Sequence, residues 1–305
     1  MLGHGDVGHR VVVRHRVGSQ ATDALGELVA VSESNFTVRT RDGEVAVPRV
    51  DVLAAKRIPD RRARSGTERL ESIAALGWPA AETDHLGDWL LRATDGWTAR
   101  GNSALPVGDP GLPLPEAVDA VVAWYTARGL VPAITVPLPL GRRLTAELDR
   151  RGWSASPPTL VQTAPIDGLT GPPDPGIRVT RAPSEEWLAA AGRQKHGLPE
   201  VARRLLSSGP EVRFAQGNGP TGTLAAIGRG VVAHGWLGIS VVGVQPEHRR
   251  QGWARRVTKA LAGEAAALGA TSAYLQVEAH NEAAIALYAD QGFRTAHAYV
   301  TRRMA

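Results

Sequence analysis

The sequence predicts an α/β (α+β) protein that carries a small all-β domain at its N-terminal end. Its first fifty or so residues alternate apolar and polar positions on both sides of an Asp-Gly pair, which is typical of short antiparallel strands. From Thr67 onward, helical and strand patterns follow one another, and 305 residues are enough for at least two domains. We therefore expect a β domain over residues 1–59 and two α/β parts over residues 60–170 and 171–305.

The composition excludes several classes of protein. The chain has no cysteine, which excludes a disulfide framework, a thiol nucleophile and a cysteine-ligated metal. Its apolar runs fall short of the ~18 residues of a membrane-spanning helix, and its first residues lack the apolar core of a signal peptide. We therefore expect a cytoplasmic protein with no membrane partner.

The charge balance is moderately basic. Lys and Arg total 35 against 30 acidic residues, and only three of the cations are lysines. A net charge of +5 bears on anionic partners and not on the fold. It favours a phosphate-bearing ligand more than it favours nucleic acid.

The N-terminal domain contains four stretches that favour strands, at residues 9–17, 25–31, 36–40 and 44–47. The last two flank Asp42-Gly43, a strong hairpin signal. This spacing predicts a five-strand barrel of the Src-homology type. Such barrels bind peptides or nucleic acid in some proteins, but we favour a stability or dimer module, since a fold does not define a function.

A basic segment, residues 56–66, joins this domain to the rest of the chain. A nucleic-acid interface would need aromatic residues among the arginines for base stacking, and this segment has none. We interpret it as a solvated linker.

The two α/β parts show clear element patterns. The first has predicted helices at 67–76, 115–128 and 142–151, with strands at 88–93 and 133–136. The second has predicted helices beginning at 184 and spanning 200–207, 253–268 and 282–291, with strands at 212–215, 223–227, 236–244 and 273–277.

Two helix–strand–helix units within these parts have the same spacing. In the first unit, Gly129 ends one helix and Gly152 ends the next, and in the second unit Gly269 and Gly292 hold these places. Both pairs of glycines are 23 positions apart, and an aromatic residue follows the second glycine of each pair. We interpret the match as an internal duplication, with the Pro- and Gly-rich residues 167–176 as the linker between the copies.

A G-x-G-x-x-G string at residues 217–222 is not a dinucleotide site. The dinucleotide fingerprint requires a helix to begin at this string, whereas a strand pattern follows it. We interpret it as a hairpin turn.

The segment at residues 241–255 combines a strand, a glycine-bearing loop and the beginning of a helix. Free N–H groups and the helix dipole make such a corner an anion site. Gly252 permits a close backbone approach, and the small Ala254 leaves room for a phosphate. From these residues alone, an unliganded corner is an equally good interpretation.

Two motifs in order resemble the GNAT superfamily of N-acetyltransferases. Arg249-x-x-Gly252-x-Ala254 is similar to its Q/R-x-x-G-x-G/A signature, and the segment from Asn281 through Tyr288 to Phe293 resembles its second motif. The resemblance covers residues 177–305. Residues 67–165 resemble a degenerate half of the same fold without the pyrophosphate loop, and Trp253 departs from the small aliphatic residue usual at its position.

The resemblance implies acetyl-CoA as co-substrate. The pyrophosphate would lie on the backbone N–H groups of the loop, and the pantetheine would pair with the preceding strand like an added half-strand. The cofactor-binding residues implied in this way are Val242, Gly243, Val244, Arg249, Arg250, Gln251, Gly252, Trp253, Ala254, Arg255 and Asn281.

Two residues of the second motif have two interpretations each. Asn281 precedes a helix and is suited to cap it, and the family adds a cofactor contact. Tyr288 has the spacing of a core aromatic, whereas in the family a tyrosine here protonates the departing thiolate.

The general base stays open among Glu278, His234 and His280. The histidines show no spacing suited to a metal, so we expect none.

The expected function is acetyl transfer from acetyl-CoA directly to a primary amine, and the acceptor stays open among a small metabolite, an aminoglycoside-like compound, a peptide N-terminus and a protein lysine. We expect the junction between the two α/β parts to shape the acceptor site. The alternatives are a non-catalytic acyl-CoA sensor or scaffold and a nucleic-acid-binding protein that uses the barrel. A homodimer is open as well.

Overall fold

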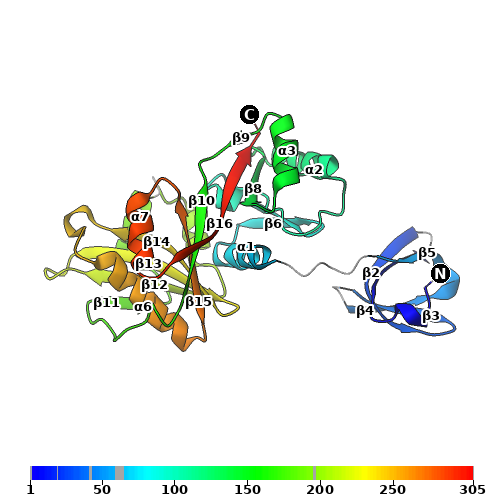
Figure 1. Cartoon of the computed structure of the whole chain (residues 1–305), viewed down its shortest axis with the longest axis horizontal. Helices are drawn as coiled ribbons and strands as arrows, with labels where there is room; N and C mark the ends of the chain where they lie inside the picture. The colour runs from blue at the N-terminus through cyan, green and yellow to red at the C-terminus, as the bar shows by residue number, and fades with distance from the viewer. Residues whose placement is uncertain (1, 19, 41–42, 59–64, 195–196, 305) are drawn as a thin grey trace. The chain divides into compact units, whose positions relative to one another are not determined.

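The computed structural model describes residues 2–18, 20–40, 43–58, 65–194 and 197–304. The chain forms two compact units, Met1–Arg64 and Ser65–Ala305 (Figure 1). The second unit contains both predicted α/β parts, so the domain boundary at residue 170 stays a prediction.

The N-terminal unit is a five-stranded antiparallel sheet with the order β4-β3-β2-β1-β5. Alternate residues of its strands point into one core, which contains Val11, Leu28, Phe36 and Val38. The strands are β1 (Arg10–Val17), β2 (Gln20–Val31), β3 (Asn35–Thr40), β4 (Gly43–Pro48) and β5 (Val52–Arg57), and short 3-10 turns are η1 (His4–Asp6) and η2 (Arg49–Asp51).

The predicted hairpin is confirmed, because Thr40 of β3 pairs with Gly43 of β4. The two connecting residues, Arg41 and Asp42, lie outside the described residues. The predicted linker began too early, since Lys56 and Arg57 belong to β5. Its residues 59–64 also lie outside the described residues.

The second unit is built on one large mixed sheet with the order β11-β12-β13-β14-β15-β10-β16-β8, and β9 pairs with β16. Neighbours in this path run antiparallel except β14 and β15, which run parallel. The strands are β8 (Ala133–Leu138), β9 (Ser154–Ala155), β10 (Thr159–Pro165), β11 (Ile177–Thr180), β12 (Glu211–Asn218), β13 (Leu224–Ala233), β14 (Trp236–Val244), β15 (Ser272–Glu278) and β16 (Arg294–Arg303), and a separate ribbon pairs β6 (Glu82–Leu86) with β7 (Trp89–Ala93).

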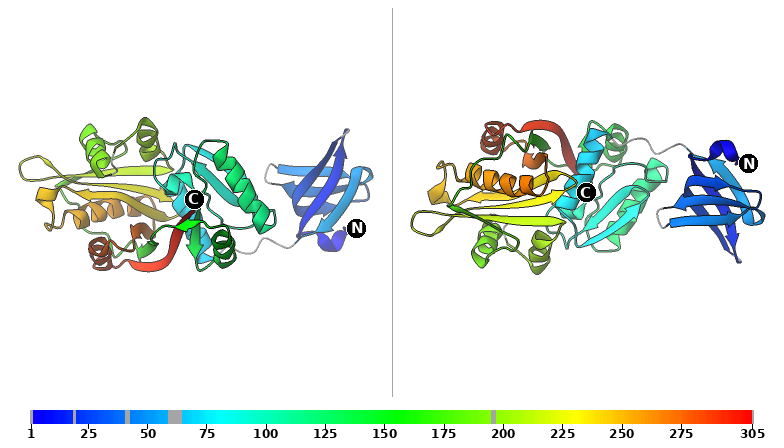
Figure 2. Two further views of the ribbon diagram at one scale, coloured as in Figure 1. Left: turned by 90° about the horizontal axis from the view of Figure 1, so that it is seen from above. Right: turned by 90° about the horizontal axis from the view of Figure 1, so that it is seen from below.

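Helices cover both faces of this sheet. The helices are α1 (Gly66–Gly77), α2 (Leu114–Thr126), α3 (Arg142–Arg150), α4 (Glu185–Gln194), α5 (Glu200–Ser207), α6 (Trp253–Ala267) and α7 (Glu282–Ala289). Figure 2 shows α4 and α5 on one face, and α6 and α7 on the other.

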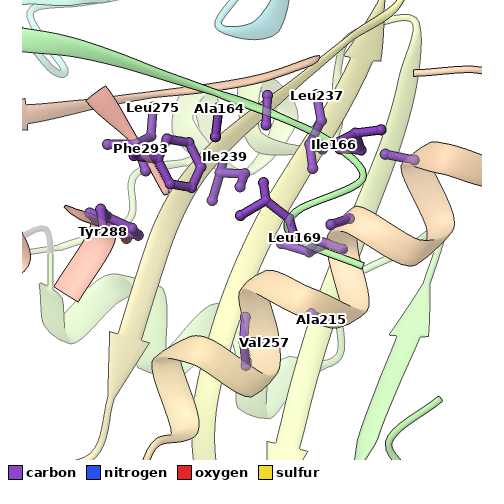
Figure 3. Close-up of a cluster of buried hydrophobic side chains, with 14 of the residues drawn as sticks. Ala164, Ile166, Leu169, Ala215, Leu237, Ile239, Val257, Leu275, Tyr288 and Phe293 are labelled. Atoms are coloured by element: carbon purple, nitrogen blue, oxygen red, sulfur yellow. The ribbon is translucent and has the colours of Figure 1, made fainter. Parts of the chain in front are cut away.

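Helix α6 packs closely on the sheet. It buries Val257, Leu261 and Ala265, which share one helical face (Figure 3). A glycine beneath it allows the approach, since a Cβ on Gly228 would lie 2.4 Å from the Val257 Cγ1.

The two α/β parts exchange strands. β10 comes from the first part but lies between β15 and β16 of the second. β16, near the C-terminal end, pairs in turn with β10 and with β8 of the first part (Figure 1). Each part therefore completes the sheet of the other, and residues 65–305 form one body.

Both predicted helix–strand–helix units are present, as α2-β8-α3 and α6-β15-α7. The hairpin predicted at residues 217–222 is also confirmed, since Asn218 pairs with Leu224. Strands β10 and β16, however, were not predicted. Their inward side chains include Gln162, His297 and Arg302, which are buried, so these strands lack the alternating apolar signal of a half-buried strand.

Candidate functional site

The site begins where β14 separates from β15. The parallel ladder joins Trp236–Ile239 to Ser272–Leu275 and goes no further. Beyond it, β15 continues to pair with β10 on its other side. Residues 240–244 of β14 therefore present one row of backbone groups that no β15 residue pairs with in the described ladder.

A β-bulge bends β14 at this point. Ile227 pairs with Gly243 and Arg229 with Ser240, so two residues of β14 oppose one residue of β13. Within the bulge, Val241 has a φ of 54°. A β-branched residue in this region is strained, and such strain gathers at functional sites.

The loop after β14 leads into α6 through two more left-handed residues. Arg250 has a φ of 62° and Gly252, the N-cap of α6, a φ of 78°. A Cβ on Gly252 would meet no atom within 4 Å, so glycine serves the backbone conformation here and not close packing.

The N-terminus of α6 has neither a side-chain cap nor an acidic residue in its first turn. The first intrahelical bond is donated by the Arg256 N–H to the Gly252 carbonyl, at 3.1 Å. The N–H groups of Trp253, Ala254 and Arg255 precede it and have no intrahelical acceptor by geometry. Together with the helix dipole these N–H groups have the arrangement that anions favour, as predicted for a candidate anion site.

Trp253 does not interfere with these donors. Its ring is buried beneath the loop, with the Arg256 guanidinium carbon 3.9 Å from the ring centroid. A Cβ on Gly217 of β12 would lie 2.9 Å from the ring. Tryptophan in place of the usual small residue at position 253 therefore leaves the backbone N–H groups on the outer face of the loop uncovered.

Positive charge surrounds the helix N-terminus. Arg249, Arg250 and Arg255 are exposed around the loop. Arg255 lies 3.8 Å from the carboxylate of Asp290, the residue that caps the C-terminus of α7. A cavity of about 150 Å³ lies beside this pair and is lined by Gly168, Leu169, Arg255, Lys259, Asp290 and Gln291.

The predicted capping role of Asn281 is confirmed. Its Oδ1 accepts a hydrogen bond from the Ala284 N–H at 3.1 Å, at the first turn of α7. The side chain is otherwise exposed, and a cofactor contact stays a prediction.

Tyr288 is 8% exposed and packs edge-on against Phe293, with 5.6 Å between ring centroids. Both belong to the cluster shown in Figure 3. Burial raises the pKa of the Tyr288 hydroxyl to about 12, so the group stays protonated at neutral pH. Both predicted roles, core aromatic and proton donor, are compatible with this position.

The three base candidates lie in different places. His234 is in the tight turn between β13 and β14, at the opposite end of β14 from the loop. Glu278 and His280 are exposed near the end of β15, with 3.2 Å between the His280 Nε2 and the Glu278 carboxylate. Across the described ranges no three His, Asp or Glu side chains gather as metal ligands, and no helix there is long and apolar enough to span a membrane.

One residue beside the site was not predicted. Gln194, at the end of α4, lies directly over Gly243, where a Cβ would be 1.2 Å from its Nε2. A larger residue at 243 would displace the end of this exposed side chain, and no local pattern reveals the contact, because Gln194 belongs to a distant helix.

The fold and this site define an acyltransferase of the GNAT superfamily. Among solved structures, a GCN5-related N-acetyltransferase from Kribbella flavida matches 79% of this chain and 96% of its own, with a TM-score of 0.60 and 19% identity. A tandem GNAT protein from the clavulanic acid biosynthesis pathway matches 80% of this chain and 89% of its own, with a TM-score of 0.52 and 15% identity.

Sequence comparison places the chain more narrowly. Residues 65–302 match a family described as "Probable histone acetyltransferase Rv0428c C-terminal", and residues 5–56 match the "Rv0428c N-terminal Sm-like domain". The chain is 32% identical to the probable histone acetyltransferase Rv0428c of Mycobacterium tuberculosis, over 97% of this chain and 95% of the relative. It is 27% identical to an uncharacterized N-acetyltransferase, YobR of Bacillus subtilis, over 74% of this chain and 93% of the relative.

The chain belongs to the Rv0428c family of acetyltransferases, in which an Sm-like domain precedes the GNAT part. The predicted GNAT fold and the predicted small N-terminal barrel are both confirmed.

Proposed function

We propose that this protein uses acetyl-CoA to acetylate a primary amine directly. The observation that carries the proposal is the uncapped N-terminus of α6 beside the bulged, half-paired strand β14. One element offers donors for a pyrophosphate, and the other offers a free strand edge for the amide groups of a pantetheine arm.

Individual residues then have separate tasks. The N–H groups of Trp253, Ala254 and Arg255 would hold the pyrophosphate, and the exposed Arg249 and Arg250 add positive charge around it. The edge of β14 over Val242, Gly243 and Val244 would pair with the pantetheine arm. Because β14 separates from β15 after Ile239, the pantetheine arm would be directed toward the interior of the protein.

When bound, acetyl-CoA supplies an activated thioester. In the transfer an N–C bond forms, the C–S bond breaks, and one proton moves from the amine to the sulfur. An N–H group at the bulge would stabilise the carbonyl oxygen as it gains negative charge. Tyr288, protonated at neutral pH, would donate the proton to the departing sulfur.

The test is thermal unfolding with and without acetyl-CoA. A ligand at ~100 times its dissociation constant adds about 2.7 kcal/mol to the free energy of unfolding. We expect a clear upward shift in the wild type. A tryptophan at the N-cap would cover the N–H groups, so G252W should lose the shift.

Gly152→Trp is the matched control. Gly152 also has a positive φ, of 74°, and open space at its Cβ, but it follows α3 in the other α/β part. G152W should carry the same backbone strain and keep the acetyl-CoA shift. No shift in the wild type would disprove the proposal, and a shift lost equally in both variants would show strain and not contact.

A further inference from the structure

The loop between β7 and α2 carries a second group of aromatic and cationic side chains. It belongs to the first α/β part and presents Trp97 and Arg100, both partly buried. Trp97 stacks on Trp78, with ring centroids 5.7 Å apart and planes inclined by 20°. The Arg100 guanidinium lies over the Trp78 ring, 5.3 Å from its centroid.

This loop is held in one shape by Asn102. The Asn102 Oδ1 accepts hydrogen bonds from the N–H groups of Thr94 and Gly96, at 2.8 and 3.0 Å. Its Nδ2 donates to the carbonyls of Trp97 and Thr98, each at 2.9 Å. Thr98, a β-branched residue, is held at a φ of 61°. A strained loop that its own side chain fixes is a rigid support for the groups it presents.

Arg100 differs from the neighbouring arginines in one donor, its Nε. Arg92 donates to the Ser103 carbonyl at 2.9 Å, and Arg229 donates to the carbonyls of Leu206, Gly77 and Ser208 at 2.7 to 2.8 Å. The Arg100 Nε is buried and has no partner among the residues that the structure describes. A buried donor without an acceptor costs free energy, which a bound oxyanion would recover.

The surroundings of Arg100 are positive. Burial first, and then the nearby charge of Arg100, lower the pKa of Arg229 to about 10. The nearby carboxylate is Glu71, which already hydrogen-bonds the buried His297 at 2.6 Å. Arg100 thus lies within electrostatic reach of two other guanidinium groups, those of Arg92 and Arg229.

The cluster lies beside the bulged strand. Arg229 contacts the Trp78 ring at 5.5 Å and approaches the Ser240 Oγ at 3.5 Å, next to the strained Val241. Trp97 and Val241 pack against the same hydrophobic cluster, which belongs to the face covered by α4 and α5. The anion site at α6 lies on the opposite face, so Arg100 is separate from it.

We propose that the acceptor amine carries an oxyanion, a carboxylate or a phosphate, which Arg100 binds beside the Trp97 and Trp78 rings. The proposal rests on the proposed function, because it assigns the acceptor side of the same site. It predicts that an acceptor with an oxyanion is acetylated faster than a lysine-rich protein segment, because like charges repel.

The first test observes Arg100 itself. The ¹H–¹⁵N resonance of its Nε, assigned by its absence in R100K, is followed in the full chain with and without acetyl-CoA. The probes are glycine, β-alanine and γ-aminobutyrate, their carboxamides and the matching aminoalkyl phosphonates. We expect a saturable shift with acids of one chain length and none with the carboxamides. The carboxylate and phosphonate arms distinguish the two oxyanions.

The second test measures release of the CoA thiol with the same probes and with a lysine-rich peptide. We expect R100Q to raise KM for the acids by about tenfold or more, with R100K intermediate because lysine keeps the charge but not the planar donors. R178Q is the matched control, since Arg178 is an exposed arginine on the edge strand β11.

These experiments distinguish failure of the acceptor proposal from failure of the proposed function. Acetyl-CoA binding, measured separately by titration, should be equal in the wild type, R100Q and R178Q. Equal responses of the Arg100 resonance to acids and carboxamides would overturn the proposal, as would faster acetylation of the lysine-rich peptide. Absence of acetyl-CoA binding with an intact response to acids would instead overturn the proposed function.

Discussion

At the scale of single residues, Tyr288 has the environment of a proton donor. Its hydroxyl is buried beside Phe293, and burial raises its pKa to about 12. The folded-state pKa is above the usual value, so the protonated form persists throughout the neutral range. The group would lose its proton only in strongly basic solution.

We predict that Tyr288→Phe lowers turnover about 10²- to 10⁴-fold, the usual contribution of a positioned acid. The factor should be the same at pH 6 and pH 9, because Tyr288 does not titrate between them. Acetyl-CoA binding should be unchanged, and release of the CoA thiol measures the turnover.

Tyr125→Phe is the control for this prediction. Tyr125 is also fully buried, and its hydroxyl donates to the Arg92 carbonyl at 2.9 Å in the first α/β part. Its loss should cost about 1 kcal/mol of stability and leave turnover intact. Equal turnover of Y288F and the wild type would contradict the acid role, whereas acetyl-CoA binding without turnover in the wild type would favour a sensor of acyl-CoA.

At the scale of elements, α6 is held by small residues beneath it. A Cβ on Gly228 would lie 2.4 Å from the Val257 Cγ1, whereas Gly263 of α6 has no atom within 4 Å of the same position. The same substitution is therefore expected to have opposite effects at the two sites.

We predict that Gly228→Ala destabilises the second unit by roughly 1–3 kcal/mol, because it forces α6 away from β13. Gly263→Ala should stabilise it by up to about 1 kcal/mol, through helix propensity. Chemical denaturation of the two variants measures both. A G228A variant as stable as the wild type would show that α6 can shift without cost.

At the scale of the whole molecule, the exchange of β10 and β16 joins the two α/β parts. The proposed acetyl-CoA site lies in one part, but the sheet of that part is completed by the other. The N-terminal Sm-like unit is built on a separate sheet and a separate core.

We predict that Leu148→Ala lowers the melting temperature of the transition that acetyl-CoA raises. Leu148 is fully buried in α3, and its truncation should cost roughly 2–5 kcal/mol. Leu28→Ala is the matched change in the Sm-like unit, where Leu28 is also fully buried. It should leave the acetyl-CoA-dependent transition unchanged.

Scanning calorimetry with and without acetyl-CoA distinguishes the effect of L148A from that of L28A. If L148A left the acetyl-CoA-dependent transition at its wild-type temperature, the two α/β parts would unfold independently. The continuous sheet would then not transmit stability between them.

Local patterns in the sequence were sufficient for much of this protein. Helix periodicity and glycine stops predicted α2, α3, α6 and α7 within a few residues of their observed bounds. The Arg249-x-x-Gly252-x-Ala254 segment indicated the superfamily, because a helix N-terminus that holds an anion is a local structure with a local signature.

The tertiary structure alone decided the rest. β10 and β16 are central strands whose buried polar residues, Gln162, His297 and Arg302, gave no apolar alternation. Gln194 lies beside Gly243 and Arg100 lies over the Trp78 ring, and both contacts join elements that are far apart in sequence. A local motif is specified by the residues within one turn or loop, whereas strand exchange and an unpaired guanidinium depend on which distant segments the fold brings together.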